Sequence, residues 1–165
     1  MRGLSFITIL ISSLLITSCG TDDNIDMTTA RNDILSVLEN YQTAHETQNI
    51  DLLRNCFSPK SDIIILGTDE KELWVERESL LQEQQRFYES IDEVKLSVRD
   101  KVVKMCPTGK SGWFYMRVNW FVKSSTDKYT LENIRTTGVM NKEDDKWGIV
   151  MMHTSMPVKG QAVRY

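Results

Sequence analysis

The chain has 165 residues, with 20 basic and 23 acidic side chains and a formal net charge of −3 at pH 7. This length is typical of one domain with a proper hydrophobic core. The slightly acidic balance and the lack of a basic block argue against nucleic acid as a partner.

Residues 1–18 have the features of a secretion signal. Arg2 supplies a basic start, and the apolar run 4–16 that follows is shorter than the roughly 20 residues that a spanning helix needs. The sequence Ile16-Thr17-Ser18-Cys19 then matches the cleavage pattern of bacterial lipoproteins. We therefore expect a lipid on Cys19 that anchors the protein to a membrane. The alternative is an ordinary signal peptide followed by a chance cysteine.

Lipidation of Cys19 would place the protein in the cell envelope. Gly20 stands where an aspartate often holds lipoproteins at the inner membrane, so we expect the outer membrane, on its periplasmic or surface face. The polar and acidic residues 19–29 predict a flexible tether. One domain is expected over residues 30–157, with a C-terminal tail over 158–165.

The first half of the domain is predicted to be mainly helical. Residues at helical spacing predict a first amphipathic helix. Its inner face would carry Ile34, Leu38, Tyr41 and His45. Asn49 is a suitable N-cap for a second, short helix that ends before Pro59. A strand over 62–68 and a third helix over 77–89 follow. Because Cys56 lies on the apolar face of the second helix, a buried free thiol is favoured over a disulfide with Cys106. No Cys/His spacing resembles a zinc site, and we expect no metal or other cofactor.

The second half predicts an antiparallel meander of four strands, over 94–105, 113–123, 129–141 and 147–155. The second of these strands has large apolar groups on both faces. One face carries Phe114, Met116, Val118, Trp120 and Val122, and the other includes Trp113, Tyr115 and Phe121. One face would be covered by helices and the other by a partner, as in a homodimer, or by a C-terminal segment. Period-two alternation along the last strand groups Trp147, Ile149, Met151, His153 and Ser155 on one face.

Three stretches resemble SnoaL-like and ketosteroid-isomerase-like domains of the nuclear-transport-factor-2-like superfamily. They are Tyr41-Gln-Thr-Ala-His45 with Gln48-Asn49-Ile50-Asp51 and Phe57, then Ile65 to Glu70 with Leu73-Trp74, and finally Trp147 to Ser155 with its terminal His-x-Ser. The resemblance covers about residues 30–157. It implies an α+β fold in which a strongly curved, mainly antiparallel sheet forms a cone around about three N-terminal helices. The open end of such a cone holds an apolar pocket for a small molecule.

The resemblance also bears on chemistry, since members include isomerases, cyclases and dehydratases. Tyr41 falls where a tyrosine of ketosteroid isomerases stabilises an enolate, although a core tyrosine is the alternative. The proton-shuttling aspartate of those enzymes falls on Ile65 or Leu66, whose side chains cannot carry a proton. Steroid isomerisation is therefore not expected, and the fold alone does not settle function.

Three further residues are candidates for the pocket. The resemblance places His153 in the interior as a candidate acid or base, with a core histidine as the alternative. Asp69, with Glu70 beside it, would reach the mouth or else form a solvated turn. An inward Arg135 would need one of these carboxylates, whereas the alternative is an ion pair on the outer face.

These considerations predict a pocket in which the candidate catalytic groups are His153, Asp69 and Tyr41. Its ligand contacts would be Trp74, Arg135 and Tyr115, and its apolar wall Ile65, Leu66 and Phe87. The leading hypothesis is a lipid-anchored domain that binds a small, partly apolar molecule. One alternative is a SnoaL-like isomerase, cyclase or dehydratase that uses His153 with Asp69 or Tyr41. The other is a non-catalytic dimeric interaction module.

Overall fold

The computed structural model describes residues 26–60, 62–158 and 160. The predicted signal peptide, Cys19 and most of the predicted tether lie outside the described residues. Helix α1 nevertheless begins at Met27, inside the segment 19–29 that was predicted as tether. It begins there because the Asp26 carboxylate accepts hydrogen bonds from the amides of Thr28 and Thr29, at 2.9 and 3.2 Å.

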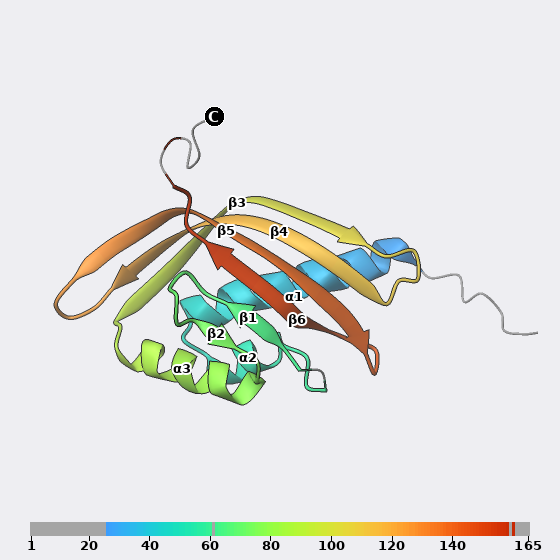
Figure 1. The fold of residues 1–165 in the computed structure, drawn as a ribbon, viewed down its shortest axis with the longest axis horizontal. Helices are drawn as coiled ribbons and strands as arrows, with labels where there is room; N and C mark the ends of the chain where they lie inside the picture. The colour runs from blue at the N-terminus through green and yellow to red at the C-terminus, as the bar shows by residue number, and fades with distance from the viewer. Residues whose placement is uncertain (1–25, 61, 159, 161–165) are drawn as a thin grey trace, which may run out of the picture.

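The fold is α+β, as predicted (Figure 1). Its elements in chain order are α1 (Met27–Glu46), α2 (Ile50–Arg54), β1 (Ile64–Leu66), β2 (Leu73–Trp74), α3 (Arg77–Glu89), β3 (Glu93–Met105), β4 (Ser111–Lys123), β5 (Lys128–Glu143) and β6 (Lys146–Ser155). The six strands form one open, mixed sheet in the order β2-β1-β6-β5-β4-β3. Neighbouring strands are antiparallel except β1 and β6, which are parallel. The two-residue strand β2 was not predicted.

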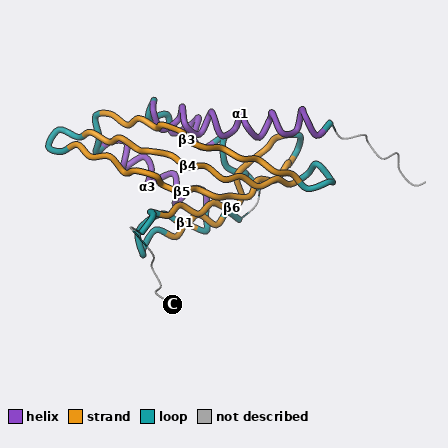
Figure 2. Tube along the Cα trace, turned by 90° about the horizontal axis from the view of Figure 1, so that it is seen from above, coloured by secondary structure: helices purple, strands orange, loops and turns teal. Residues whose placement is uncertain are grey.

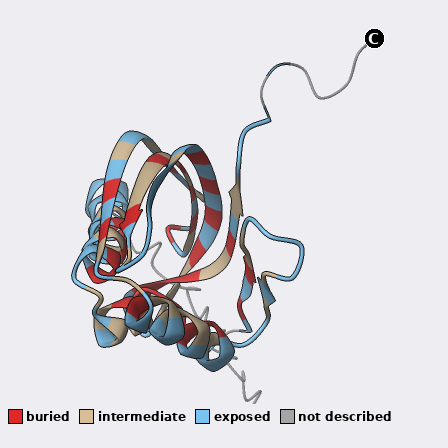
Figure 3. Cartoon of the chain, turned by 90° about the vertical axis from the view of Figure 1, so that its left-hand side faces the viewer, coloured by how far each residue is buried: buried red, intermediate tan, exposed pale blue. Residues whose placement is uncertain are grey.

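The helices lie against the concave face of the curved sheet. Helix α1 packs along β3 and α2, and α3 packs against α2 and β2 (Figures 1 and 2). Buried residues alternate along the strands and face the helices (Figure 3). The predicted alternation of β4 is observed, and the structure shows that its inner face carries buried Phe114, Met116, Val118 and Val122 and half-buried Trp120. No helix of the described chain is long and apolar enough to cross a membrane.

Helix α1 also covers the exposed edge of the sheet. The Gln42 side-chain amide donates to the carbonyl of Leu96 at 3.1 Å, and the Glu46 carboxylate accepts from the amide of Leu96 at 3.0 Å. These bonds satisfy backbone groups of β3 that would otherwise be open to another strand. They also hold α1 in place over the core.

A β-bulge in β6 reverses one prediction from the sequence. Val139 pairs with Met151 but Met140 pairs with Ile149, so Val150 is an extra residue in β6. One added residue exchanges the two faces of a strand. Before the bulge the inward-facing residues of β6 have odd numbers, such as Trp147 and Ile149, and after it they have even numbers. Met152 is accordingly buried and His153 is exposed on the outer face. The predicted interior position of His153 is wrong for this reason.

A second bulge, in β5, shapes the open end of the cone. Val118 pairs with Ile134 whereas Trp120 pairs with Leu131, so β5 has one residue more than β4 in this interval. Asn133 adopts a positive φ of 58°, and its amide donates to the Asn119 side chain at 2.9 Å. The extra residue lets Ile134 and Leu131 both face the interior.

Candidate functional site

A pocket of about 520 Å³ lies between α3, the β1–β2 turn and the inner ends of β4, β5 and β6. This volume is within the range of roughly 300–1,000 Å³ that is typical of small-molecule sites. Its wall combines aliphatic residues such as Leu53, Leu80 and Met152 with six aromatic ones: Tyr41, Phe57, Trp74, Phe87, Trp120 and Tyr129. A second hollow of about 590 Å³, on the β3 side, has no buried unpartnered polar atom on its described residues.

The structure brings part of the predicted site together. The pocket is lined by Tyr41, Ile65, Leu66, Asp69, Trp74 and Phe87. Their roles in binding stay predictions, since the structure shows only their placement. Asp69 is exposed in the turn after β1.

Three predicted residues are not in this pocket: His153, Arg135 and Tyr115. Tyr115 and Arg135 belong to the outer face, on which Tyr115 pairs with Thr137 and Arg135 with Arg117 across the strands. Arg135 is exposed and donates to the carbonyl of Met156 at 3.5 Å, instead of pairing with Asp69 or Glu70. The predicted convergence of His153 and Arg135 with Tyr41 and Trp74 in one cavity is therefore wrong for His153 and Arg135.

The histidine that does line the pocket is His45 of α1. Its side chain is only 2% exposed, and its Nδ1 lies 3.0 Å from the hydroxyl of Tyr88 on α3. Nε2 is buried and has no hydrogen-bond partner among the described residues. The rings of Tyr41 and Trp120 meet His45 edge to face at centroid distances of 4.6 and 4.8 Å. Such ring contacts are weaker than a conventional hydrogen bond.

Burial determines the protonation state of these groups. It lowers the pKa of His45 to about 3, so the imidazole is neutral at pH 7. Burial also raises the pKa of Tyr41 and Tyr88 well above the usual range, which keeps both hydroxyls protonated. If the Tyr88 hydroxyl donates to Nδ1, its proton is satisfied and the imidazole hydrogen resides on Nε2. This tautomer presents an N–H donor without an acceptor, which costs about 1–3 kcal/mol when buried.

Sequence reasoning missed His45 as a site residue because it fitted the apolar spacing of the first helix. One signal was present: Tyr41 and His45 are four residues apart and therefore share a helix face. The other half of the arrangement, Tyr88, is 43 residues away along the chain. No local pattern connects the two.

Carboxylates surround the mouth of the pocket. Asp69, Glu72 and Glu83 line it, and among the described residues no lysine or arginine does. The Glu72 carboxylate accepts from the amides of Thr68 and Asp69, at 2.6 and 3.0 Å. A β-carbon on Gly67 would lie 2.1 Å from the same Glu72 oxygen, so glycine allows this close approach.

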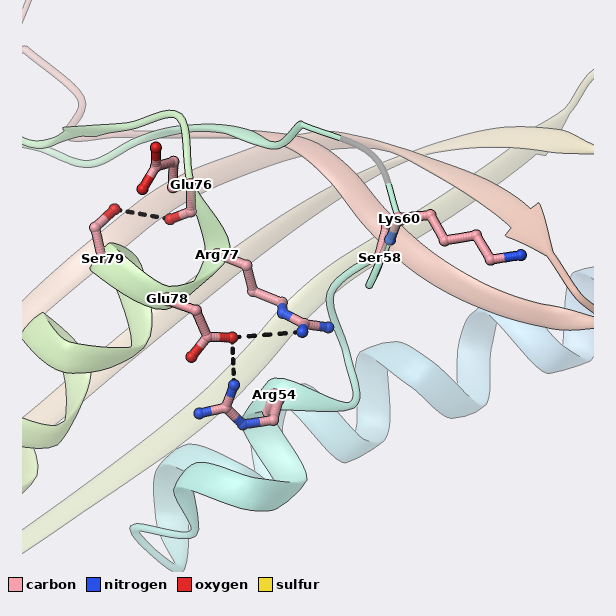
Figure 4. A network of polar contacts seen from close by, with 7 residues as sticks. All are labelled: Arg54, Ser58, Lys60, Glu76, Arg77, Glu78 and Ser79. Carbon is pink, nitrogen blue, oxygen red and sulfur yellow. Dashed lines mark hydrogen bonds and ion pairs between the residues drawn. The ribbon is translucent and has the colours of Figure 1, made fainter.

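Helix α3 is held over the pocket by contacts with α2. Glu78 at the start of α3 accepts from Arg54 of α2 and lies 3.4 Å from Arg77 (Figure 4). These side chains are partly exposed, so the ion pairs contribute little to stability. They orient α3, while its buried residues Leu80 and Leu81 supply the packing.

Cys56 and Cys106 are free, and Cys56 is buried, as the sequence favoured. Burial raises the pKa of the Cys56 thiol to about 12, which makes it unreactive. In the described part of the chain, no group of three or more His, Cys, Asp or Glu side chains is placed to hold a metal ion.

Comparisons with known proteins agree with this architecture. A family model for the SnoaL-like domain matches residues 34–159. A nuclear transport factor 2-like superfamily protein from Salmonella enterica is similar, with 12% identity, a TM-score of 0.72, and coverage of 84% of this chain and 99% of that one. A nuclear transport factor 2-like protein of unknown function from Shewanella oneidensis has 20% identity, a TM-score of 0.58, and coverage of 78% and 99%. No curated protein matches significantly. The chain belongs to the SnoaL-like domain family.

Proposed function

We propose that the domain binds a small, mostly apolar molecule whose hydrogen-bond acceptor reaches Nε2 of His45. The observation that carries this proposal is the unpartnered, buried Nε2 on a residue that lines an aromatic pocket. Of the buried side-chain polar atoms without a partner in the described chain, it is the one on a pocket residue. A ligand carbonyl, ether or hydroxyl oxygen would remove the cost of leaving this donor unpaired.

Binding is a better account of this pocket than acid–base turnover. A histidine with a pKa of about 3 is a weak base at neutral pH. Ile65 and Leu66 occupy the position of the isomerase aspartate, and His153 faces solvent on the other side of the sheet. The SnoaL-like fold commonly carries ligand-binding, isomerase or dehydratase domains, and the arrangement around His45 favours the first of these.

The proposal predicts a bound molecule that depends on His45. Native mass spectrometry of the purified protein should detect a small-molecule adduct, and the double variant His45→Phe/Tyr88→Phe should retain it about tenfold less well. A lost hydrogen bond of about 1.4 kcal/mol corresponds to that factor. Removing both polar partners together keeps the packing and leaves no orphaned hydroxyl. Tyr115→Phe, on the outer face, is the matched control and should retain the adduct. Equal retention by all three proteins would contradict the proposal.

We also propose that the protein is anchored to the cell envelope through a lipid on Cys19. The support is the sequence pattern of residues 1–19. Cys19→Ala should abolish incorporation of a fatty-acid probe and move the protein from the membrane fraction to the soluble fraction. Membrane attachment that survives the substitution would refute the anchor, and the same probe on Cys106→Ala controls for nonspecific thiol labelling.

A homodimer through the outer face of the sheet is the third proposal. Trp113, Val102 and Val139 are 49%, 46% and 37% exposed, and Trp113 lies directly beside Val139 in the β4–β5 register. A second copy would remove this apolar surface from water. Sedimentation at micromolar concentrations should show a dimer, and Trp113→Lys should dissociate it. A wild-type monomer under these conditions would count against the proposal.

A further inference from the structure

The acidic and neutral polar groups of the apolar pocket are unevenly distributed along its wall. Its acidic lining residues are Asp69, Glu72 and Glu83, whereas the buried His45 is neutral. Arg86, which does not line the pocket, pairs with Glu83 from the helix surface. The remaining two carboxylates have no ion pair among the described side chains. The wall therefore carries excess negative charge at its mouth.

Glu72 is positioned by hydrogen bonds from the turn that follows β1. Its Oε2 accepts hydrogen bonds from the Thr68 and Asp69 amides and, at 3.5 Å, from the Thr68 hydroxyl, all of them neutral donors. These bonds fix the carboxylate over Gly67 without cancelling its charge, so the group is oriented before any ligand arrives. An arrangement of this kind favours a cation over a neutral molecule.

The aromatic residues of the pocket wall also favour a cation over a neutral molecule. The π faces of Trp, Tyr and Phe are electronegative and attract ammonium groups, with tryptophan the strongest. The pocket wall includes Trp74, which is half-buried, and Tyr129, which is 44% exposed, together with Phe87. These rings and the three carboxylates occur on elements that meet at the open end of the cone.

We infer that the pocket takes an organic cation, in which an apolar body carries an alkylammonium group toward Asp69, Glu72 and Glu83 and an acceptor toward His45. This inference rests on the proposed binding function and adds the charge of the ligand. The unpartnered Nε2 of His45, on another lining residue, is an observation independent of the carboxylates. Its N–H would receive the uncharged acceptor, which gives the ligand a fixed direction.

Three probes of similar size test the charge preference: benzyltrimethylammonium, benzyl alcohol and phenylacetate. Titration of the full-length purified protein, followed by calorimetry or by NMR shifts of the tryptophan indoles, should give an affinity about tenfold higher for the ammonium than for the alcohol. That factor corresponds to about 1.4 kcal/mol, within the range of a partly desolvated cation–π contact. Phenylacetate should bind most weakly. The preference for the ammonium should shrink at high salt, because its carboxylate component is screened.

Variants that lack pocket carboxylates test whether these side chains cause the preference for the ammonium probe. Asp69→Asn/Glu83→Gln should weaken benzyltrimethylammonium by about fivefold and leave benzyl alcohol unchanged. The matched control Asp92→Asn/Glu89→Gln removes the same charge away from the pocket and should alter neither probe. Equal affinities for ammonium and alcohol in the wild type would overturn the cation inference while leaving the binding function standing. An ammonium preference that both double variants reduce equally would also overturn it, since net charge would then be the cause.

Discussion

Acidification below pH 6.5 should destabilise the wild type more steeply than the double variant His45→Phe/Tyr88→Phe. The expected difference is about 1.4 kcal/mol in the free energy of unfolding for each pH unit between about pH 6 and pH 4. The cause is the lowering of the His45 pKa from 6.5 to about 3 by burial.

The sign follows from proton binding. In the unfolded chain His45 takes up a proton as the pH falls through 6.5, whereas in the folded protein it stays neutral until about pH 3. The unfolded state therefore binds more protons within this window and gains stability relative to the native state. The contribution of a neutral, buried His45 is complete above pH 6.5 and is lost progressively toward pH 3.

Urea unfolding at several pH values would measure this difference. Carboxylates contribute to the slope in every variant, so the comparison between proteins isolates His45. The chain has two histidines, and the exposed His153 provides the control. His153→Phe should retain the wild-type slope. If the His45/Tyr88 double variant also kept that slope, the burial of His45 would be contradicted.

Replacement of Gly148 by alanine should lower the free energy of unfolding by about 3 kcal/mol, the upper end of the usual cost of overpacking. A β-carbon at this position would lie 2.7 and 2.8 Å from the backbone nitrogen and α-carbon of Ser58. Backbone atoms cannot move aside as a flexible side chain does. The close approach exists because the Ser58 amide donates to the Ile149 carbonyl at 3.0 Å, and the Ile149 amide donates to the Cys56 carbonyl at 2.9 Å.

The same junction supports the pocket. Phe57, which lines it, bridges to Ile149 beside the glycine. Gly148→Ala should therefore reduce ligand retention as well as stability. Thermal and urea unfolding, together with native mass spectrometry, would measure both effects. Lys146→Ala changes an exposed residue of the same strand and should shift stability by less than about 0.5 kcal/mol. A Gly148→Ala protein as stable as this control would show that the segment 56–58, which follows α2, and β6 do not approach so closely.

Local patterns in the sequence were enough for most of the fold. The third helix was predicted at residues 77–89 and is observed as Arg77–Glu89. The alternation in β4 correctly grouped Phe114 and Met116 on one face, which the structure shows to be the buried one. Tyr41 was expected on the inner face of the first helix, and it is buried there. These predictions succeeded because helical and strand periodicities depend on neighbouring residues, and burial of one face follows directly from them.

The sequence by itself determined the α+β class, the alternation of the two faces of β4 and the helix face that carries Tyr41 and His45. Only the tertiary structure decided which histidine enters the pocket. The extra residue Val150 arises from the pairing of β5 with β6, and it turns His153 outward although the periodicity of β6 alone indicates the opposite. His45 acquires its partner Tyr88 through the packing of α3 on the rest of the domain. Both outcomes depend on contacts between distant segments, and side-chain periodicity along one element contains no information about such contacts.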